Sequence, residues 1–230
     1  MSRFDPAHLE LLRLARLLKA DPDRLEPLSV LPVEDLRTLR DRIAERLFEE
    51  GRDAFQRAAN VANFVPAPLA AKLAEHALGP VLAARTTAVT PPQKAVELSG
   101  RFSAGFLADV AEEIDPRVVD DLVESLPPKV VAAVGRELAA REEWLVMADF
   151  VGGISSAALV ATVEALSTES ILRISVYLED PDRLDEVVAL LDVERLADAV
   201  TVARAEGLDE ELAWITESVG DEQRARIPSS

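Results

Sequence analysis

Prolines divide this chain into segments that are too short for long helices. Five of its 14 prolines follow a residue that can cap a helix, at Asp5-Pro6, Asp21-Pro22, Thr90-Pro91, Asp115-Pro116 and Asp180-Pro181. Proline suits the first turn of a helix, where its missing N–H would have no intrahelical partner, and Asp or Thr can accept from the next N–H groups. Because apolar runs of period two are missing as well, the sequence predicts an all-α chain of short helices.

An apolar pattern of the form i, i+1, i+4, i+8 occurs three times at an offset of 12 residues. Its members share one face of a helix, and the offset leaves about nine residues for each helix, which is too short to be stable alone. Neighbouring helices must therefore stabilise one another, either side by side in an α-solenoid, which the regular offset favours, or in a compact bundle of irregular short helices. The three sets are Phe106, Leu107, Val110 and Ile114; Val118, Val119, Leu122 and Leu126; and Val130, Val131, Val134 and Leu138.

The distribution of apolar residues divides the chain into three regions. Residues 1–60 hold amphipathic helices, one over 5–19 and a longer one from about Pro32 with an apolar stripe at Leu36, Leu39, Ile43 and Leu47. Residues 61–220 hold the helical repeats, and 221–230 is expected to be a frayed tail. Later helices are expected over 142–150, 155–166, 168–179, 182–191, 193–206 and 209–218.

Acidic residues outnumber basic ones by 42 to 25, and residues 101–230 carry the whole net charge of −17. Such a surface repels phosphate backbones and anionic membranes, so we expect no nucleic-acid binding, and it attracts basic partners or cations. The chain has no cysteine, no signal-peptide pattern at its start and no apolar run of membrane-spanning length. We therefore expect a soluble cytoplasmic protein without membrane insertion.

Residues 58–87 are unusually poor in charge, and their only charged residues are Lys72, Glu75 and Arg85, beside the titratable His76. Helices that start near Pro68 and Pro80 are almost wholly apolar, and such a helix is either the centre of the fold or a surface that a partner covers. The candidate partner-contact residues are Phe64, Val65, Leu69, Leu73 and Leu78.

Motifs for catalysis are missing from the sequence. There is no Gly-rich phosphate loop or nucleophile elbow, and His8 and His76 have no partner at metal-ligand spacing. The pair Gly152-Gly153 is interpreted as the end of one helix, followed by the cap of the next at Ser155. We therefore expect a protein that is not an enzyme and has no tightly bound cofactor.

Two acidic clusters are weak candidates for a loose Mg²⁺ site. Carboxylates on adjacent helical turns can bind a divalent cation through water, although a solvated surface with helix caps explains the same residues. The candidate ligands are Asp115, Asp120, Asp121, Glu124, Asp180, Asp182, Asp185 and Glu186.

The segment 114–131, IDPRVVDDLVESLPPKVV, resembles the intracellular N-terminal domain of MgtE-type magnesium transporters. The resemblance extends over about residues 88–192 and includes the turn Leu126-Pro127-Pro128. It implies a right-handed superhelix of short helices with a cytosolic regulatory or docking role. Transport is not implied, because this sequence contains neither the nucleotide-binding-like modules nor the membrane domain of the transporters.

Together these features predict a non-enzymatic α-solenoid that acts as a protein–protein interaction or regulatory module, through a partner or by self-association. Two alternatives stay open: a divalent-cation sensor, and a protein that binds a small molecule in an apolar cavity among its helices.

Overall fold

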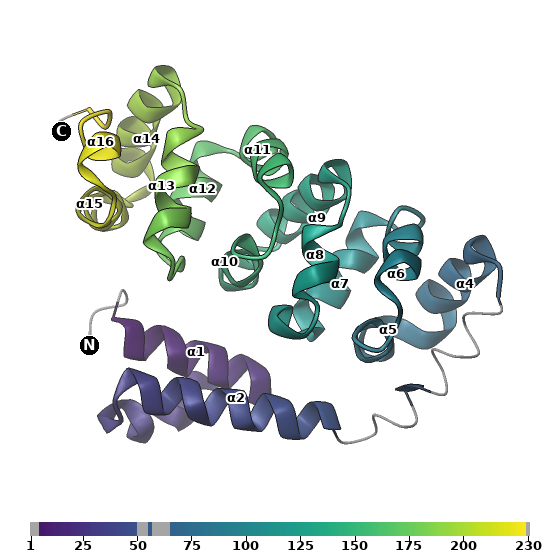
Figure 1. Cartoon of the computed structure of the whole chain (residues 1–230). Coiled ribbons are helices and arrows are strands. Elements are labelled where there is room, and N and C mark those ends of the chain that lie inside the picture. Colours follow the sequence, from purple (N-terminus) through teal and green to yellow (C-terminus); the bar gives the residue numbers. More distant parts are fainter. Residues whose placement is uncertain (1–4, 50–54, 57–64, 229–230) are drawn as a thin grey trace. The chain divides into compact units, whose positions relative to one another are not determined.

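The computed structural model describes residues 5–49, 55–56 and 65–228 of the chain, and all its regular structure in these ranges is helical (Figure 1). The prediction of an all-α chain is confirmed for these ranges. The chain forms two compact units, Met1–Ala54 and Phe55–Ser230. The division lies between Ala54 and Phe55, slightly before the expected boundary after residue 60.

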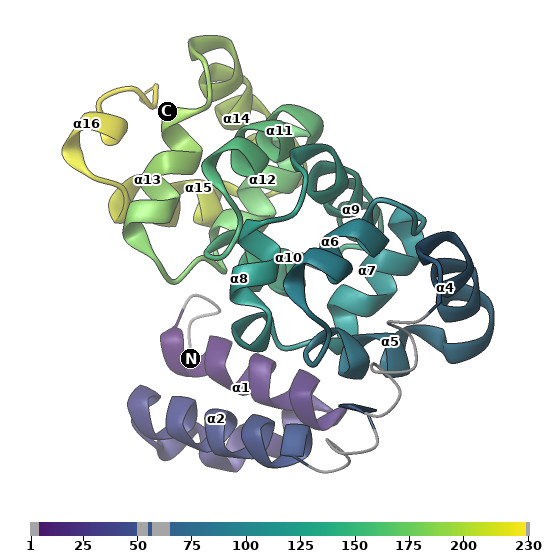
Figure 2. The same ribbon diagram turned by 45° about the vertical axis from the view of Figure 1, so that its right-hand side comes forward.

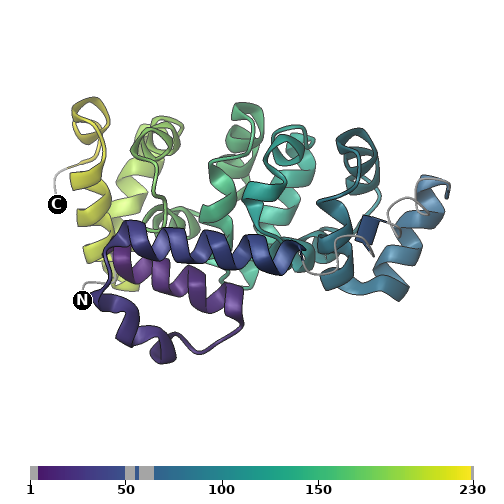
Figure 3. The ribbon, with the colours of Figure 1, turned by 60° about the horizontal axis from the view of Figure 1, so that its bottom comes forward.

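The first unit consists of α1 (Pro6–Leu18), the 3-10 helix η1 (Pro22–Val30) and α2 (Val33–Glu49). Both predicted helices of this region are confirmed, and α1 packs against η1 and α2 (Figure 3). Leu36 of the predicted stripe is fully buried, together with an apolar face of α1. That face consists of Leu9, Leu11, Leu14 and Ala15.

A buried carboxylate joins these two helices. Glu10 of α1 is enclosed by arginines, with Oε2 2.9 Å from Arg40 Nη1, and Oε1 3.2 Å from Arg37 Nε and 3.8 Å from Arg13 Nη1. Burying a charge is costly unless it is paired. The pairs therefore offset the cost of burying Glu10, and they orient α2 on α1.

The second unit is a succession of short helices. Its elements are α4 (Ala67–Leu73), the π-helical turn η2 (Ala74–Leu78), α5 (Gly79–Thr87), α6 (Pro92–Ser99), α7 (Ala104–Glu113), the 3-10 turn η3 (Pro116–Val118), α8 (Asp120–Glu124), α9 (Pro128–Ala140), α10 (Trp144–Val151), α11 (Ser156–Ala165), α12 (Thr168–Ser175), α13 (Pro181–Ala189), α14 (Val193–Glu206), α15 (Asp209–Ser218) and α16 (Asp221–Arg224). The six later helices expected from the sequence correspond to α10 to α15, with α14 and α15 matching residue for residue.

Most of these helices pack against the next but one along the chain. This holds for α4 on α6, α5 on α7, α7 on α9, α9 on α11, α10 on α12 and α12 on α14 (Figure 2). At the α9–α11 contact the two helices approach closely, since a Cβ built on Gly135 would lie 3.2 Å from Thr162 Cγ2. Each short helix is therefore stabilised by partners from elsewhere in the sequence, as its length requires.

Four of the five cap–proline pairs act as the sequence predicts. Asp5, Asp21, Asp115 and Asp180 each accept a hydrogen bond of 3.0 to 3.1 Å from the N–H two residues on. Thr90 differs, because its hydroxyl donates to the carbonyl of Thr86 at 2.7 Å and α6 begins at Pro92 without a side-chain cap.

The middle set of the repeat forms a shorter helix than predicted. Instead of a helix of about nine residues, as its 12-residue spacing suggested, the segment forms the turn η3 and then α8, which ends at Glu124. The expectation was wrong because the backbone leaves the helical conformation at Val119, with φ −131° and ψ 18°, between η3 and α8. Pro127 disfavours the helical conformation of Leu126 and so limits how far α8 can extend.

Arginines connect helices that are about 30 to 40 residues apart. Arg195 Nη1 and Nη2 donate to the carbonyls of Val163 and Leu166, at 2.7 and 2.8 Å, where α11 ends. Arg183 makes the same kind of contact with the end of α10. The last carbonyls of a helix have no intrahelical partner, and a cation there is favoured by the helix dipole. These arginines therefore stabilise both the helix end and the contact between neighbours.

The C-terminal segment is also held in this way, in contrast to the expected frayed tail. Residues 221–224 form α16, and Arg226 donates to the carbonyls of Val188 and Leu191 at 3.1 and 2.6 Å. Sequence reasoning missed this because the contact partners lie more than 30 residues away.

Candidate functional site

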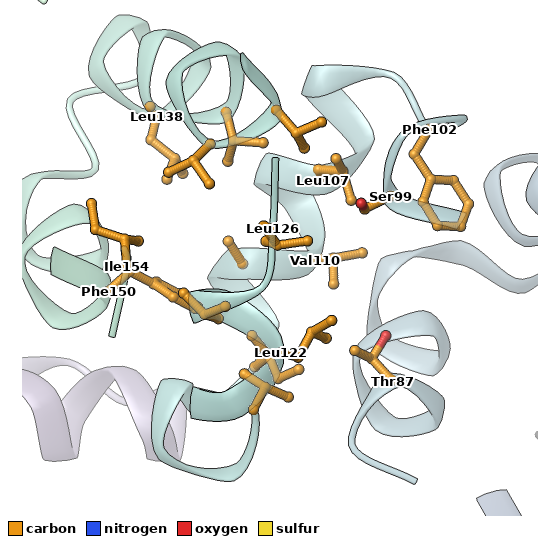
Figure 4. A pocket seen from close by; sticks show the side chains of 18 of the residues that line it. Thr87, Ser99, Phe102, Leu107, Val110, Leu122, Leu126, Leu138, Phe150 and Ile154 are labelled. Carbon is orange, nitrogen blue, oxygen red and sulfur yellow. The ribbon is translucent and has the colours of Figure 1, made fainter. Parts of the chain in front are cut away.

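The Phe55–Ser230 unit contains an apolar groove with a volume of about 520 Å³ (Figure 4). Its lining side chains come from helices α4 to α13 and are mainly aliphatic or aromatic. Lys94 is the only ionisable residue among those described lining residues, and its Nζ lies 3.1 Å from Glu97 Oε2. A concave site of this size and composition suits an apolar ligand.

The three apolar sets of the repeat converge on this groove. All their members line it except Val118, which is 42% exposed. In Figure 4, Leu107 and Val110 of α7, Leu122 of α8, Leu126 and Leu138 extend into the same space. Of these, all but Leu138 are only partly buried. The 12-residue pattern therefore marks a surface that the described helices leave partly uncovered.

The hydroxyl groups at the groove already donate hydrogen bonds to backbone carbonyls. Thr86, Thr87 and Thr90 donate to backbone carbonyls in the preceding turn at 2.7 to 3.0 Å, and Ser99 donates to the carbonyl of Val96 at 2.8 Å. These side chains therefore present methyl groups and acceptor lone pairs to the groove rather than O–H donors.

The candidate contact residues take different positions. Val65, Leu73 and Leu78 line the groove, Leu69 does not, and Phe64 lies outside the described residues. Leu69, Leu73 and Leu78 are 59%, 50% and 40% exposed, so the alternative that they form the centre of the fold is wrong. Instead, α4 buries its small side chains, and small residues allow helices to approach closely. These are Ala67, Ala70 and Ala71.

The candidate Mg²⁺ ligands of the two clusters mostly contribute to caps and ion pairs. Asp115 and Asp180 are helix caps, with Arg117 also bound to Asp115 at 2.6 Å. Asp185 accepts from the N–H of Gly220 at 2.8 Å, and Glu186 pairs with Arg183. The remaining candidates lie exposed on their helices; these are Asp120, Asp121, Glu124 and Asp182. Within residues 5–49, 55–56 and 65–228, no three potential ligand side chains gather into a metal-binding group.

Two further predictions concern the Gly152-Gly153 pair and His76, and both lie within the described residues. Gly152 is the residue that follows α10, and Ser155 caps α11 by accepting from the N–H of Ala158 at 3.3 Å, as expected. His76 Nδ1 lies 2.9 Å from the carbonyl of Lys72, one turn earlier.

A second polar contact lies close to the groove. The N–H and the hydroxyl of Ser103 donate to Glu75 Oε1, at 2.7 and 2.8 Å, and both hold the pKa of this carboxyl below its ordinary value. The contact connects η2 to the N-terminus of α7, because Ser103 is also the N-cap of that helix. It stabilises the end of the unit from which Leu73 and Leu78 reach the groove.

Sequence reasoning missed part of the groove. Phe150, Val151 and Ile154 line it from α10 and the turn that follows, outside the repeated pattern. The high apolar content of the segment 144–151 was the signal that could have found them.

Comparisons of the chain with protein-family models, with curated proteins and with solved structures give no match. Among the described helices, none has both the length and the apolar character that crossing a membrane requires.

Proposed function

We propose that the Phe55–Ser230 unit is a non-enzymatic binding module, a superhelix of short helices that binds a protein partner in its apolar groove. The observation that carries the proposal is the convergence of the repeated apolar face on the groove, where most of its side chains, all but Phe106, Val119 and Leu138, are only partly buried. Burial of such surface by a ligand contributes about 25 cal/mol per Å².

The superhelix is the finer part of this proposal. Its support is the packing of helices on the next but one, which lets short helices follow one another while each buries one face. The resemblance to the MgtE N-terminal domain and the Mg²⁺-sensor alternative stay predictions. A rise in melting temperature with millimolar Mg²⁺, beyond that caused by matched ionic strength, would favour the sensor.

A second candidate is the binding of a small apolar molecule. It is favoured by the groove volume of about 520 Å³, which lies within the range of small-molecule sites. It shares the site with the first candidate, so the same variants test both.

The test is binding of a neutral apolar dye, Nile red, to the full chain and to two matched double variants. Val110→Thr with Val130→Thr changes two groove residues without changing their size, and Val160→Thr with Val193→Thr changes two exposed valines outside the groove. Each hydroxyl that a bound apolar group must desolvate costs about 1 kcal/mol, or about five-fold in Kd.

We therefore expect the groove variant to bind the dye about 10- to 30-fold more weakly and the control variant to bind it as the parent does. Equal effects of the two variants, or no saturable dye binding by the parent, would refute the groove as the binding site. Thermal melting followed by circular dichroism verifies that both variants are folded.

A further inference from the structure

The groove offers an occupant one cation and otherwise mainly hydrocarbon. Lys94 of α6 is the only ionisable side chain among the described lining residues, and 22% of its side chain is exposed. The hydroxyls at the groove donate to backbone carbonyls, so a polar group of an occupant would be buried beside them without a donor, which is costly. These hydroxyls belong to Thr86, Thr87, Thr90 and Ser99. Such a lining favours an occupant that has a hydrocarbon body and a single anionic group.

The ion pair of Lys94 is one that an occupant can exchange. Lys94 Nζ lies 3.1 Å from Glu97 Oε2, and Arg101 Nη2 lies 3.8 Å from Oε1 of the same carboxylate. Two cations therefore share one carboxylate, which leaves a positive charge beside the groove. The side chains of Glu97 and Arg101 are 47% and 44% exposed, and ion pairs at such exposed sites contribute little to stability. A second carboxylate, supplied by the occupant, can bind Lys94 while Glu97 stays close to Arg101.

The charge of the segment around Lys94 differs from that of the rest of the unit. Residues 65–101 hold four Lys or Arg and two Asp or Glu, whereas residues 102–230 hold ten basic and 28 acidic residues. An anion is attracted to the first segment and repelled by the second. The anionic group of an occupant is therefore expected at α6, where the lining cation lies.

From α6 the apolar lining continues across the groove. In Figure 4, Ser99 and Phe102 mark the end of the groove at α6, and Phe150 and Ile154 lie on the far side, from α10 and the turn after it. The lining residues that α7, α8 and α9 contribute are all apolar. The groove can therefore bury an unbranched hydrocarbon chain whose polar end stays at α6.

From these observations, and resting on the small-molecule candidate above, we propose that the groove binds a long-chain carboxylate, a fatty acid. Its carboxylate binds Lys94 in competition with Glu97, and its hydrocarbon chain lies on the apolar lining toward α10. Burial of the chain supplies the affinity, and the charge-assisted hydrogen bond to Lys94 supplies the preference for an anion.

The experiment measures displacement of Nile red from the full chain by two ligands that have the same alkyl chain, dodecanoate and 1-dodecanol. It is done at about pH 8, where the carboxylate is ionised, and below the concentrations at which the ligands aggregate. The anion selectivity is the Kd of dodecanol divided by the Kd of dodecanoate, so the contribution of the shared chain cancels. We expect this selectivity to fall when the salt is raised to about 0.5 M NaCl.

Matched variants locate the charge effect. Lys94→Gln removes the lining cation, and Lys129→Gln is its control, because Lys129 also lies in the first turn of a proline-started helix but is exposed and does not line the groove. The net charge changes equally, so only Lys94→Gln should lower the anion selectivity, by about five- to tenfold. Glu97→Gln removes the competing carboxylate and should raise the selectivity by about three- to fivefold. Such a gain cannot come from a loss of folding, and circular dichroism melting verifies that all three variants are folded.

The outcomes separate this inference from the function on which it rests. Equal effects of the two lysine variants, or a selectivity that Glu97→Gln leaves unchanged or lowers, overturns the carboxylate ligand and leaves groove binding intact. Saturable binding of Nile red that neither ligand displaces overturns the long-chain ligand and favours the protein partner. Absence of saturable dye binding by the parent chain overturns the groove as a binding site, and this inference with it.

Discussion

Replacement of Arg195 is the most direct test of how neighbouring short helices stabilise one another. Its guanidinium, half-buried at the first turn of α14, donates to two carbonyls at the end of α11 at 2.7 and 2.8 Å. Arg195→Met keeps much of the aliphatic packing but leaves both carbonyls without this donor. Hydrogen bonds to a charged group contribute about 1.5–3 kcal/mol each, and partial exposure puts this pair near the lower end.

We therefore expect Arg195→Met to lower the free energy of unfolding by about 2–4 kcal/mol. For a unit of this size, that corresponds to a fall in Tm of about 4–16 °C. Arg195→Lys keeps the charge, but an ammonium cannot span the two carbonyls as the planar guanidinium does, so we expect about half of the loss. Arg136→Met is the control, because Arg136 is an exposed arginine of α9 with no hydrogen bond or ion pair in the described structure.

Thermal melting followed at 222 nm measures the effect, and amide hydrogen exchange locates it. Exchange should become faster in α11 and α14, which the contact joins, before it does in α9. If Arg195→Met and Arg136→Met have the same Tm, the arginine contacts between helices do not contribute to the free energy of unfolding, and the stability of the unit comes from apolar packing alone.

Three further predictions follow from other contacts. Glu10→Ala should destabilise the Met1–Ala54 unit by about 3–5 kcal/mol, because it removes the buried carboxylate that the buried Arg13 and the half-buried Arg37 and Arg40 share; urea denaturation measures this, and a loss below 1 kcal/mol would contradict it. Gly135→Leu should cost about 1–3 kcal/mol through overpacking at the α9–α11 contact, whereas Gly152→Ala, with open space around its Cβ position, should be neutral or stabilise by about 0.4–1 kcal/mol; calorimetric Tm values that rank the two in the opposite order would refute this packing. The lowered pKa of Glu75 means that its folded state favours the carboxylate, so the contact with Ser103 stabilises the protein above the unfolded pKa and is lost as the pH falls through the folded one; the Tm difference between the parent and Glu75→Gln should be present at pH 7 and shrink steadily as the pH is lowered through the acid range, and a difference that does not change with pH would show that the charge is not involved.

The outcome at particular residues shows which patterns are reliable. Asp180-Pro181 and Asp115-Pro116 start helices as predicted, because the cap hydrogen bond joins atoms only two residues apart. Thr90-Pro91 does not, because the hydroxyl of Thr90 donates to the preceding helix instead. Where two local interactions compete for one side chain, the sequence predicts the position of the helix boundary better than the bond made there.

Candidate site residues were harder to place. The repeated face, with Val110 and Val130, lines the groove, but Leu69, which looked equally apolar, does not, and both Leu69 and the groove residue Leu73 are half or more exposed on α4. Their exposure follows from the burial of the alanine face of the same helix. Hydropathy alone ranks leucine above alanine, so it cannot predict this choice.

The sequence by itself determined the helical class of this protein, the positions of most helix starts and the shared face of the three apolar sets. These properties depend on caps, prolines and periodicity, which act within a few residues along the chain. Only the tertiary structure decided that the shared face would line a groove, that α4 would bury its alanines, and that Arg226 would hold the C-terminal segment on Val188 and Leu191. The physical reason is that a helix face is buried or left open by partners some 30 residues away, and those partners are chosen by packing, which no local pattern records.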